Sequence, residues 1–405
     1  MSDTTAPIIT AVETLRDPTH AEFVWVRVET DTGIVGLGET MPKPIAVEAA
    51  IHERLAPLIL GRPLSPERAW TDAFQAISYV GYGGAEMRAI SAVDIALWDA
   101  LARSADLPLT ALLGGPSRDR IRVYNTCVGH GNYPDRERFF SDPGGLAREL
   151  VDEGYTGMKM APFDDYSVQS GGAHFDSKDL KEGVARIAAI RDAVGDAIEI
   201  AIEGHSSWNL PSAIRMAKAL EPYRPLWLED ILQARTPPAW RQLREATSIP
   251  ICGSERVFTR FDVMPYLEAN AWDYVNQDVA WTGGITEFRK VAALAEVFEL
   301  PVVPHNCHGP VAAAATMVVS AAVPNIAWTE TVRSFERGIH PDVATSGPKT
   351  VDGFVSLSDA PGLGVDLLDS FVAGCEVRRT TVDMIDGAGG WAAGDPWANG
   401  VDGGM

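Results

Sequence analysis

Residues 198–209 read IEIAIEGHSSWN, an apolar run of strand character that ends in a carboxylate, Glu203, and an imidazole, His205. Further short apolar runs that close on polar residues follow along the chain, namely PLWLEDI (225–231), IPICGSE (249–255), WDYVNQDV (272–279), LPVVPHN (300–306) and IAWTET (326–331). Amphipathic helical segments such as SAIRMAKALE (212–221) lie between them. Repeated strand–helix units of this length predict a parallel sheet, and seven or eight of them predict a closed α/β barrel. A doubly wound sheet is the alternative, but no glycine-rich phosphate loop supports it.

The N-terminal part of the chain follows a different pattern. Residues 8–40 alternate in the manner of antiparallel strands around the turn Asp31-Thr32-Gly33, and helical periodicity follows up to EMRAISAVDIALWDALARSA (86–105). We therefore expect an α+β domain over residues 1–120 and a barrel over 121–365. The last residues, 386–405, are rich in glycine and lack periodicity, which predicts a C-terminal tail.

Composition excludes several classes of function. The formal net charge of −21 over 405 residues argues against nucleic acid or an anionic membrane as a partner, because both require a basic face. The four cysteines are widely spaced without a CxxC pair, so neither structural zinc nor a disulfide framework is expected. No signal peptide and no run long enough to cross a bilayer is evident. We expect a cytoplasmic protein that acts on a small molecule.

Polar residues at the ends of the apolar runs form the candidate site. They are Lys159, Glu203, Glu229, Glu255, Asp278, His305 and Glu330, and from Glu203 onward they are 23 to 27 residues apart, one strand–helix unit each time. In a βα barrel, the carboxyl ends of the strands meet at one rim. Three glutamates on successive strands, Glu203, Glu229 and Glu255, would repel one another unless a cation lay between them, and all-oxygen ligands favour Mg²⁺ before Mn²⁺. The alternative for any single glutamate is a helix cap or an ion pair with Arg256 or a nearby lysine.

Asp278 and His305 end the next two runs. A carboxylate beside an imidazole selects its tautomer and raises its pKa, which makes the histidine a better base. The alternative is a histidine of the core with its hydrogen bonds satisfied. Lys159 lies in an apolar context at a strand end, which favours a role facing a carboxylate or a metal over that of a surface lysine.

The stretch AISAVDIALWDALARSADLPLTALLGG (89–115) is similar to the signature helix of the enolase superfamily, and the ordered set of strand-end residues resembles its mandelate racemase subgroup. This resemblance implies a modified TIM barrel, (β/α)7β, covered by an α+β capping domain to which residues of about 366–385 contribute. It implies Mg²⁺ on the three glutamates and an Asp278–His305 dyad that removes the proton α to a carboxylate. It also implies that Glu330 donates a hydrogen bond to the resulting enolate.

One departure from the subgroup concerns the reaction. Its racemases carry Lys-x-Lys at the end of the second barrel strand, whereas GMKMAPF (157–163) has Lys159 but Ala161 in place of the second base. The Glu203-Gly204-His205 arrangement is similar to the carboxylate-x-His of sugar-acid dehydratases in the subgroup, which implies that His205 is a general acid; alternatively, His205 only orients Glu203. We predict a Mg²⁺-dependent hydro-lyase that converts an aldonate-type, D-galactonate-like sugar acid to a 2-keto-3-deoxy acid. The alternatives are an epimerase or cycloisomerase of a sugar acid or lactone, and a non-catalytic binding barrel.

Substrate contacts are expected from loops. The segments RDPTHAE (16–22) and SYVGYGG (78–84) occupy the positions of the capping loops in the family, so we expect His20, Tyr79 and Tyr82 to contact the substrate, together with His308. The polar insertion DDYSVQSGGAHFDSKD (164–179) predicts a flap. Members of the family are commonly symmetric oligomers, so a homo-oligomer is expected.

Overall fold

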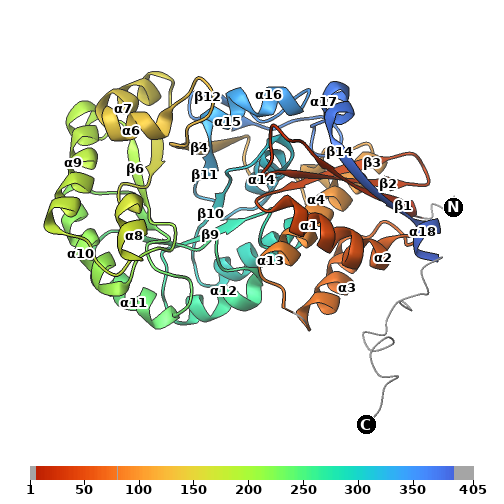
Figure 1. Ribbon diagram of the computed structural model, residues 1–405, viewed down its shortest axis with the longest axis horizontal. Coiled ribbons are helices and arrows are strands. Elements are labelled where there is room, and N and C mark those ends of the chain that lie inside the picture. Colours follow the sequence, from red (N-terminus) through yellow and green to blue (C-terminus); the bar gives the residue numbers. More distant parts are fainter. Residues whose placement is uncertain (1–5, 80, 387–405) are drawn as a thin grey trace, which may run out of the picture.

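The computed structural model describes residues 6–79 and 81–386, so nearly all of the predicted tail lies outside the described residues. Figure 1 shows two parts, an N-terminal sheet with its helices and a barrel. The sheet is antiparallel with the order β14-β1-β2-β3, formed by β1 (Ile9–Arg16), β2 (Val24–Thr30), β3 (Val35–Thr40) and β14 (Glu376–Thr381). A strand from near the C-terminus therefore completes the first sheet, pairing with β1 from Ala11 opposite Thr381 to Arg16 opposite Glu376.

Helices of the N-terminal part pack against this sheet or against one another. They are α1 (Pro44–Ala50), η1 (Ile51–Leu55), α2 (Ala56–Ile59), α3 (Pro66–Ser78), α4 (Ala85–Ser104) and the short α5 (Leu109–Leu112). The backbones of β3 and α4 lie so close that a Cβ added to Gly38 would be 1.9 Å from the carbonyl oxygen of Ala92. A glycine is required there because any side chain would overlap the helix.

Helix α4 also attaches the capping part to the barrel. The Ser91 hydroxyl accepts a hydrogen bond from the amide of Gly283 at 2.9 Å, and Asp94 Oδ2 accepts one from the amide of Thr286 at 3.0 Å. Most of the helix is buried, because one side faces the sheet and another faces the barrel. The apolar signature segment is thus explained by its position between two layers.

The barrel contains eight parallel strands. They are β4 (Arg120–Thr126), β5 (Gly157–Met160), β6 (Glu199–Glu203), β7 (Trp227–Glu229), β8 (Ile251–Gly253), β9 (Tyr274–Asp278), β10 (Val302–His305) and β11 (Thr329–Thr331). Strands β4 to β10 pair in chain order, and β11 pairs with β4. A bridge between Val302 and Ile326 joins β10 to the segment before β11.

Helices connect successive barrel strands. They are α6 (Asp135–Ser141), α7 (Pro143–Asp152), α8 (Asp164–Ser170), α9 (Ser177–Val194), α10 (Leu210–Leu220) with η2 (Glu221–Tyr223), α11 (Pro237–Glu245), α12 (Thr259–Glu268), α13 (Gly284–Val297) and α14 (Pro310–Ala322). Seven strand–helix units followed by β11 confirm the predicted (β/α)7β barrel with an α+β cap. The predicted division into residues 1–120 and 121–365 stays a proposal, with the pairing of β14 in support of a C-terminal contribution to the cap.

The chain then returns to the cap through α15 (Arg333–Gly338), α16 (His340–Val343), the hairpin β12 (Thr350–Val351) and β13 (Phe354–Ser356), α17 (Asp369–Gly374), and, after β14, α18 (Val382–Asp386). The hairpin joins the barrel sheet through antiparallel pairing of β13 with β4. Within the described part of the chain, no helix has the length and apolar character needed to cross a bilayer.

Candidate active site

The structure brings the predicted strand-end residues together. Glu203 and Glu229 are paired residues at the ends of β6 and β7, and Asp278 and His305 are paired residues at the ends of β9 and β10. Glu255 follows β8 by two residues. All seven predicted side chains are buried: Lys159, Glu203, Glu229, Glu255, Asp278, His305 and Glu330. Successive parallel strands place them at one rim, as their spacing predicts.

The three glutamates form a compact oxygen cluster. One ligand atom from each of Glu203, Glu229 and Glu255 lies within 4.8 Å of the others. The ammonium of Lys159 contacts Glu229 Oε1 and lies 3.2 Å from Glu203 Oε2 and 3.0 Å from Glu330 Oε1. The Lys159 ammonium thus lies against three buried carboxyl groups. The donor set of the oxygen cluster fits a hard divalent cation.

Burial and neighbouring charges shift the pKa values of the cluster in different directions. Burial raises the pKa of Glu229 well above its usual range, although Lys159 opposes this shift. Burial alone would lower the pKa of Lys159, but Glu229 and Glu330 raise it well above its usual range. Lys159 is therefore a fixed positive charge facing carboxylates, as predicted, rather than a surface lysine.

Asp278 and His305 form a buried pair. His305 Nδ1 donates to Asp278 Oδ2 at 2.5 Å, which directs Nε2 toward Glu255 Oε2 at 2.9 Å. Burial would lower the pKa of His305, but Glu255 and Glu330 raise it well above its usual range. A divalent cation on Glu255 would weaken that attraction and bring the imidazole closer to the range of a general base. Glu255 Oε1 lies 3.0 Å from Arg256 Nε, and Lys159 contacts Glu203 and Glu229, so the alternative of an ion pair is present at all three glutamates.

His308 lies on the same carboxylate. Its Nε2 is 2.7 Å from Asp278 Oδ2, the oxygen that also contacts His305. The pKa of Asp278 is lowered to about 2, because two nearby imidazoles outweigh the effect of burial. The side chain of His308 is fully buried, and the structure places it against Asp278. A substrate contact by His308 stays a prediction.

Trp281 and Arg88 were not predicted as site residues. The ring of Trp281 lies 4.9 Å from that of His305, and the guanidinium of Arg88 lies 4.8 Å from the Trp281 ring. Arg88 comes from α4, so the cap contributes a cation next to the dyad. The sequence carries no signal for this position, because α4 is buried on several faces and its periodicity indicates no direction.

His205 is held by a residue that sequence reasoning missed. Its Nδ1 lies 2.5 Å from Oδ2 of Asp164, the first residue of α8. Burial would lower the pKa of His205, but Glu203 and Asp164 raise it to about 9. Glu203 Oε1 accepts the backbone amide of His205 at 2.7 Å, so His205 and Glu203 are joined through the backbone rather than through the ring.

The cap residues that are predicted to contact the substrate form contacts with other parts of the protein. His20 is buried, with its ring 6.5 Å from both Phe23 and Phe371. The Tyr82 hydroxyl donates to Asp262 of α12 at 2.8 and 2.9 Å, and Tyr79 is 74% exposed. These contacts link the cap loops to the C-terminal segment and to the barrel rim. Direct substrate contacts by the three residues stay predictions.

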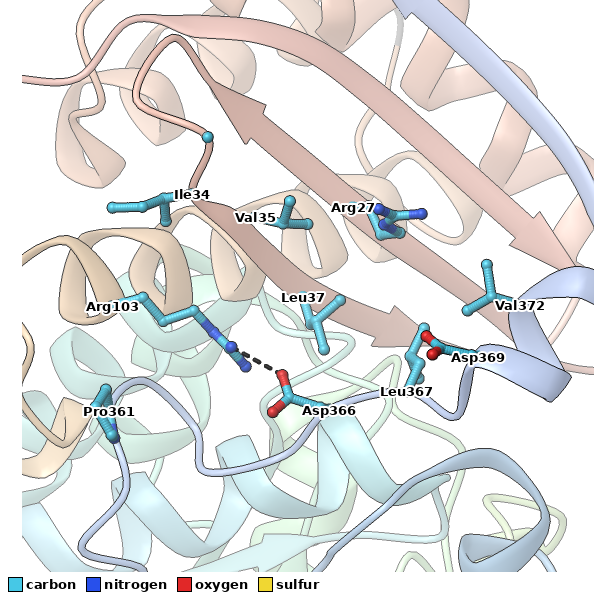
Figure 2. Close-up of a pocket in the computed structure, with 11 residues that line it drawn as sticks. Arg27, Ile34, Val35, Leu37, Arg103, Pro361, Asp366, Leu367, Asp369 and Val372 are labelled. Atoms are coloured by element: carbon cyan, nitrogen blue, oxygen red, sulfur yellow. Dashed lines mark hydrogen bonds and ion pairs between the residues drawn. The ribbon is translucent and has the colours of Figure 1, made fainter.

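A separate cavity of about 620 Å³ lies between β3 and the segment that leads to α17 (Figure 2). Arg103 projects toward Asp366 there and forms an ion pair at 2.8 Å. The cavity shares no lining residue with the strand-end cluster; it is lined by Arg27, Gly33, Ile34, Val35, Leu37, Arg103, Pro361, Asp366, Leu367, Asp369 and Val372. We therefore place the candidate active site at the strand ends.

The fold and the site define a class: capped (β/α)7β-barrel enzymes that combine a carboxylate metal cluster with an Asp–His pair. The family model described as mandelate racemase / muconate lactonizing enzyme, N-terminal domain, matches residues 1–114, and that described as enolase C-terminal domain-like matches residues 144–370. The chain belongs to the mandelate racemase / muconate lactonizing enzyme family of the enolase superfamily. The family match confirms the resemblance found in the sequence. Members of the superfamily bind a divalent metal.

Curated relatives and solved structures agree with this assignment. The chain is 32% identical to D-galactonate dehydratase of Ralstonia pickettii (strain 12J), over 90% of this chain and 93% of that one. It is 33% identical to D-gluconate dehydratase of Thermoproteus tenax, over 84% of this chain and 67% of that one. A crystal structure of a mandelate racemase subgroup enolase from Agrobacterium tumefaciens matches with a TM-score of 0.85 and 36% identity, over 93% of this chain and 100% of that one.

Proposed function

We propose that this chain is a sugar-acid dehydratase that converts an aldonate-type acid to its 2-keto-3-deoxy derivative. The observation that carries the proposal is the presence of two differently held imidazoles, His305 on β10 and His205 after β6, with the carboxylate cluster of Glu203, Glu229 and Glu255 next to both. A dehydration needs one group to remove the α-proton and another to protonate the departing hydroxyl. The names of the relatives support the same reaction class.

The two histidines are suited to different steps. His305 donates through Nδ1 to Asp278, so Nε2 is the atom that takes the proton from C2 of the substrate. The electron pair of that bond forms an enediolate, whose collapse expels the hydroxyl from C3. His205, hydrogen-bonded through Nδ1 to Asp164, supplies the proton with which the hydroxyl leaves as water. The resulting enol tautomerises to the keto acid.

A divalent cation held by Glu203, Glu229 and Glu255 would stabilise the negative charge that develops on the substrate carboxylate. We propose Mg²⁺, because all three ligands are carboxylates. Lys159, whose ammonium lies among these side chains, adds a second positive charge for the substrate carboxylate. A hydrogen bond from Glu330 to the enediolate requires a protonated carboxyl, whereas Lys159 and His305 hold the pKa of Glu330 below its usual range. The role of Glu330 as a donor therefore stays a prediction, since both Lys159 and His305 favour the ionised carboxylate.

Purified protein with Mg²⁺ and a library of C4 to C6 sugar acids tests the proposal. The readout is 2-keto-3-deoxy acid, detected as its semicarbazone, with the His205→Asn and His305→Asn variants in parallel. We expect keto acid from a few aldonates and loss of product in both variants. Deuterium uptake from D₂O into an unchanged acid, without keto product, would instead favour epimerisation or cycloisomerisation. The cytoplasmic location and the homo-oligomeric state stay predictions.

A further inference from the structure

The insertion after β5 is folded onto the loop that carries His205. Gly172 lies so close to this loop that an added Cβ would be 1.7 Å from the carbonyl oxygen of Ser207. The amide of Asn209 donates to the carbonyl of Gly172 at 3.1 Å, and the Asn209 side chain donates to that of Ala173 at 2.6 Å. The ring of Phe175 meets Trp208 edge-on at 5.3 Å. The insertion and the loop thus form one packed unit.

Asp164 extends from this unit to His205. Its Oδ2 is 2.5 Å from His205 Nδ1, and among the described residues its buried Oδ1 has no hydrogen-bond partner. Within the described residues, the side chain of Asp164 therefore forms its hydrogen bond with His205 alone. Asp278 and His305 are joined through the same atom types at the same distance of 2.5 Å. These two Asp–His pairs join Oδ2 to Nδ1, one built from barrel strands and one completed by the insertion, whereas His308 contacts Asp278 through Nε2.

His205 needs such a partner more than His305 does. Its backbone lies in the left-handed region with φ 46°, as does that of Ser206 with φ 55°. Its side chain is 48% exposed, whereas that of His305 is 6% exposed. A hydrogen bond to Nδ1 selects both the ring orientation and the tautomer, and leaves Nε2 for the other partner.

We infer that Asp164 is a positioning residue for His205, and that the docked insertion thereby orients the acid that releases the C3 hydroxyl. The inference rests on the proposed dehydratase function. In the step concerned, the C3–O bond breaks, the enediolate electron pair forms the C2=C3 bond, and the proton from His205 Nε2 joins the leaving hydroxyl to give water. The Asp164 carboxylate bonds to the His205 ring and takes no proton in this step. Its effect is therefore confined to the leaving-group step.

The Asp164→Asn variant tests this, with Asp165→Asn as the matched control. Asp165 is the next residue of α8, but its carboxylate pairs with the exposed Arg136 at 3.2 Å. Loss of an orienting partner of this kind lowers activity by about 10- to 100-fold. We expect that loss in kcat for Asp164→Asn on the best sugar acid, no loss for Asp165→Asn, and equal melting temperatures.

Two further readouts separate positioning from general damage. Exchange of the C2 hydrogen with D₂O should persist in Asp164→Asn, because the His305 step is intact. A 3-deoxy-3-fluoro analogue loses fluoride, a far better leaving group than hydroxide, so its conversion to the same keto acid should be nearly equal in Asp164→Asn and wild type. The inference is wrong if the wild type forms keto acid and the kcat of Asp164→Asn equals that of Asp165→Asn. It is also wrong if Asp164→Asn loses as much activity on the fluoro analogue as on the sugar acid. If the wild type forms no keto acid from any sugar acid, the proposed function is wrong and the inference goes with it.

Discussion

Replacing Asp278 by asparagine is expected to lower kcat by about 10²- to 10⁴-fold, the usual contribution of a general base. Asp278 Oδ2 accepts from His305 Nδ1 at 2.5 Å and from His308 Nε2 at 2.7 Å, while Oδ1 accepts from the amide of Ala280 at 2.7 Å. An asparagine has one oxygen and one NH₂ group for these three donors. If the oxygen faces the imidazoles, the NH₂ group meets the amide of Ala280, donor against donor. If the oxygen faces Ala280, the NH₂ group meets the ring nitrogens of the imidazoles instead. In the second arrangement, the His305 proton moves to Nε2 and the base is blocked.

The expected loss corresponds to about 3 to 5 kcal/mol in the activation free energy, at about 1.4 kcal/mol for each factor of ten. Both keto acid formation and exchange of the C2 hydrogen with D₂O should fall together, because each requires proton removal by His305. Asp94→Asn provides the control, since it makes the same change at another buried carboxylate, which accepts from Thr286 in the interface between the cap and the barrel. A folded Asp278→Asn enzyme that exchanges the C2 hydrogen at the wild-type rate would refute the assignment of the dyad.

Three further predictions concern the cluster, the cap and their junction. Lys159→Met leaves buried glutamates without their ammonium, and the loss of one partner of a buried ion pair costs about 3 to 5 kcal/mol of stability. The melting temperature should fall further in EDTA than in Mg²⁺, because a bound cation would replace the lost positive charge. Equal losses would count against the metal site. Burial raises the pKa of Glu39 from 4.5 to about 7, so the folded state keeps a proton that the unfolded state releases, and stability falls as pH rises through this window. Glu39→Gln should abolish that decline, worth up to about 3 kcal/mol above pH 7, and denaturation at pH 5 and pH 8 measures it. Gly38→Ala should destabilise by about 1 to 3 kcal/mol, because its Cβ would overlap the backbone of Ala92; an unchanged melting temperature would mean that β3 and α4 separate easily.

The barrel and its rim could be predicted because one physical rule links them. Parallel strands end at one face, so a polar residue at the end of each apolar run, repeated about every 25 residues, must lie near the others. This rule placed residues as far apart in sequence as Lys159 and Glu330 in contact, at 3.0 Å. It required no knowledge of loops or of how helices cover the barrel.

The same rule carries no information on side chains outside the strand ends. Asp164 lies in an insertion without apolar periodicity, and its importance depends on the docking of that insertion near Trp208. The contacts of the cap loops could not be predicted either, since the hydroxyl of Tyr82 donates a hydrogen bond to Asp262, which is 180 residues away in the sequence. Loop side chains are directed by contacts between distant segments, and periodicity in one segment does not encode such contacts.

Glu203 connects the metal cluster to the proposed acid. Its two carboxylate oxygens face different partners. Oε1 turns back to accept the amides of Gly204 at 3.0 Å and His205 at 2.7 Å, while Oε2 faces Lys159 at 3.2 Å. One oxygen therefore holds the loop of His205 in its left-handed conformation, and the other is left for a cation. The loop of the acid is thus anchored at two points, by a carboxylate of the metal cluster on its backbone and by Asp164 on its ring. A cation bound at the cluster would fix Glu203 more firmly, and through Oε1 it would fix the position from which His205 reaches the substrate.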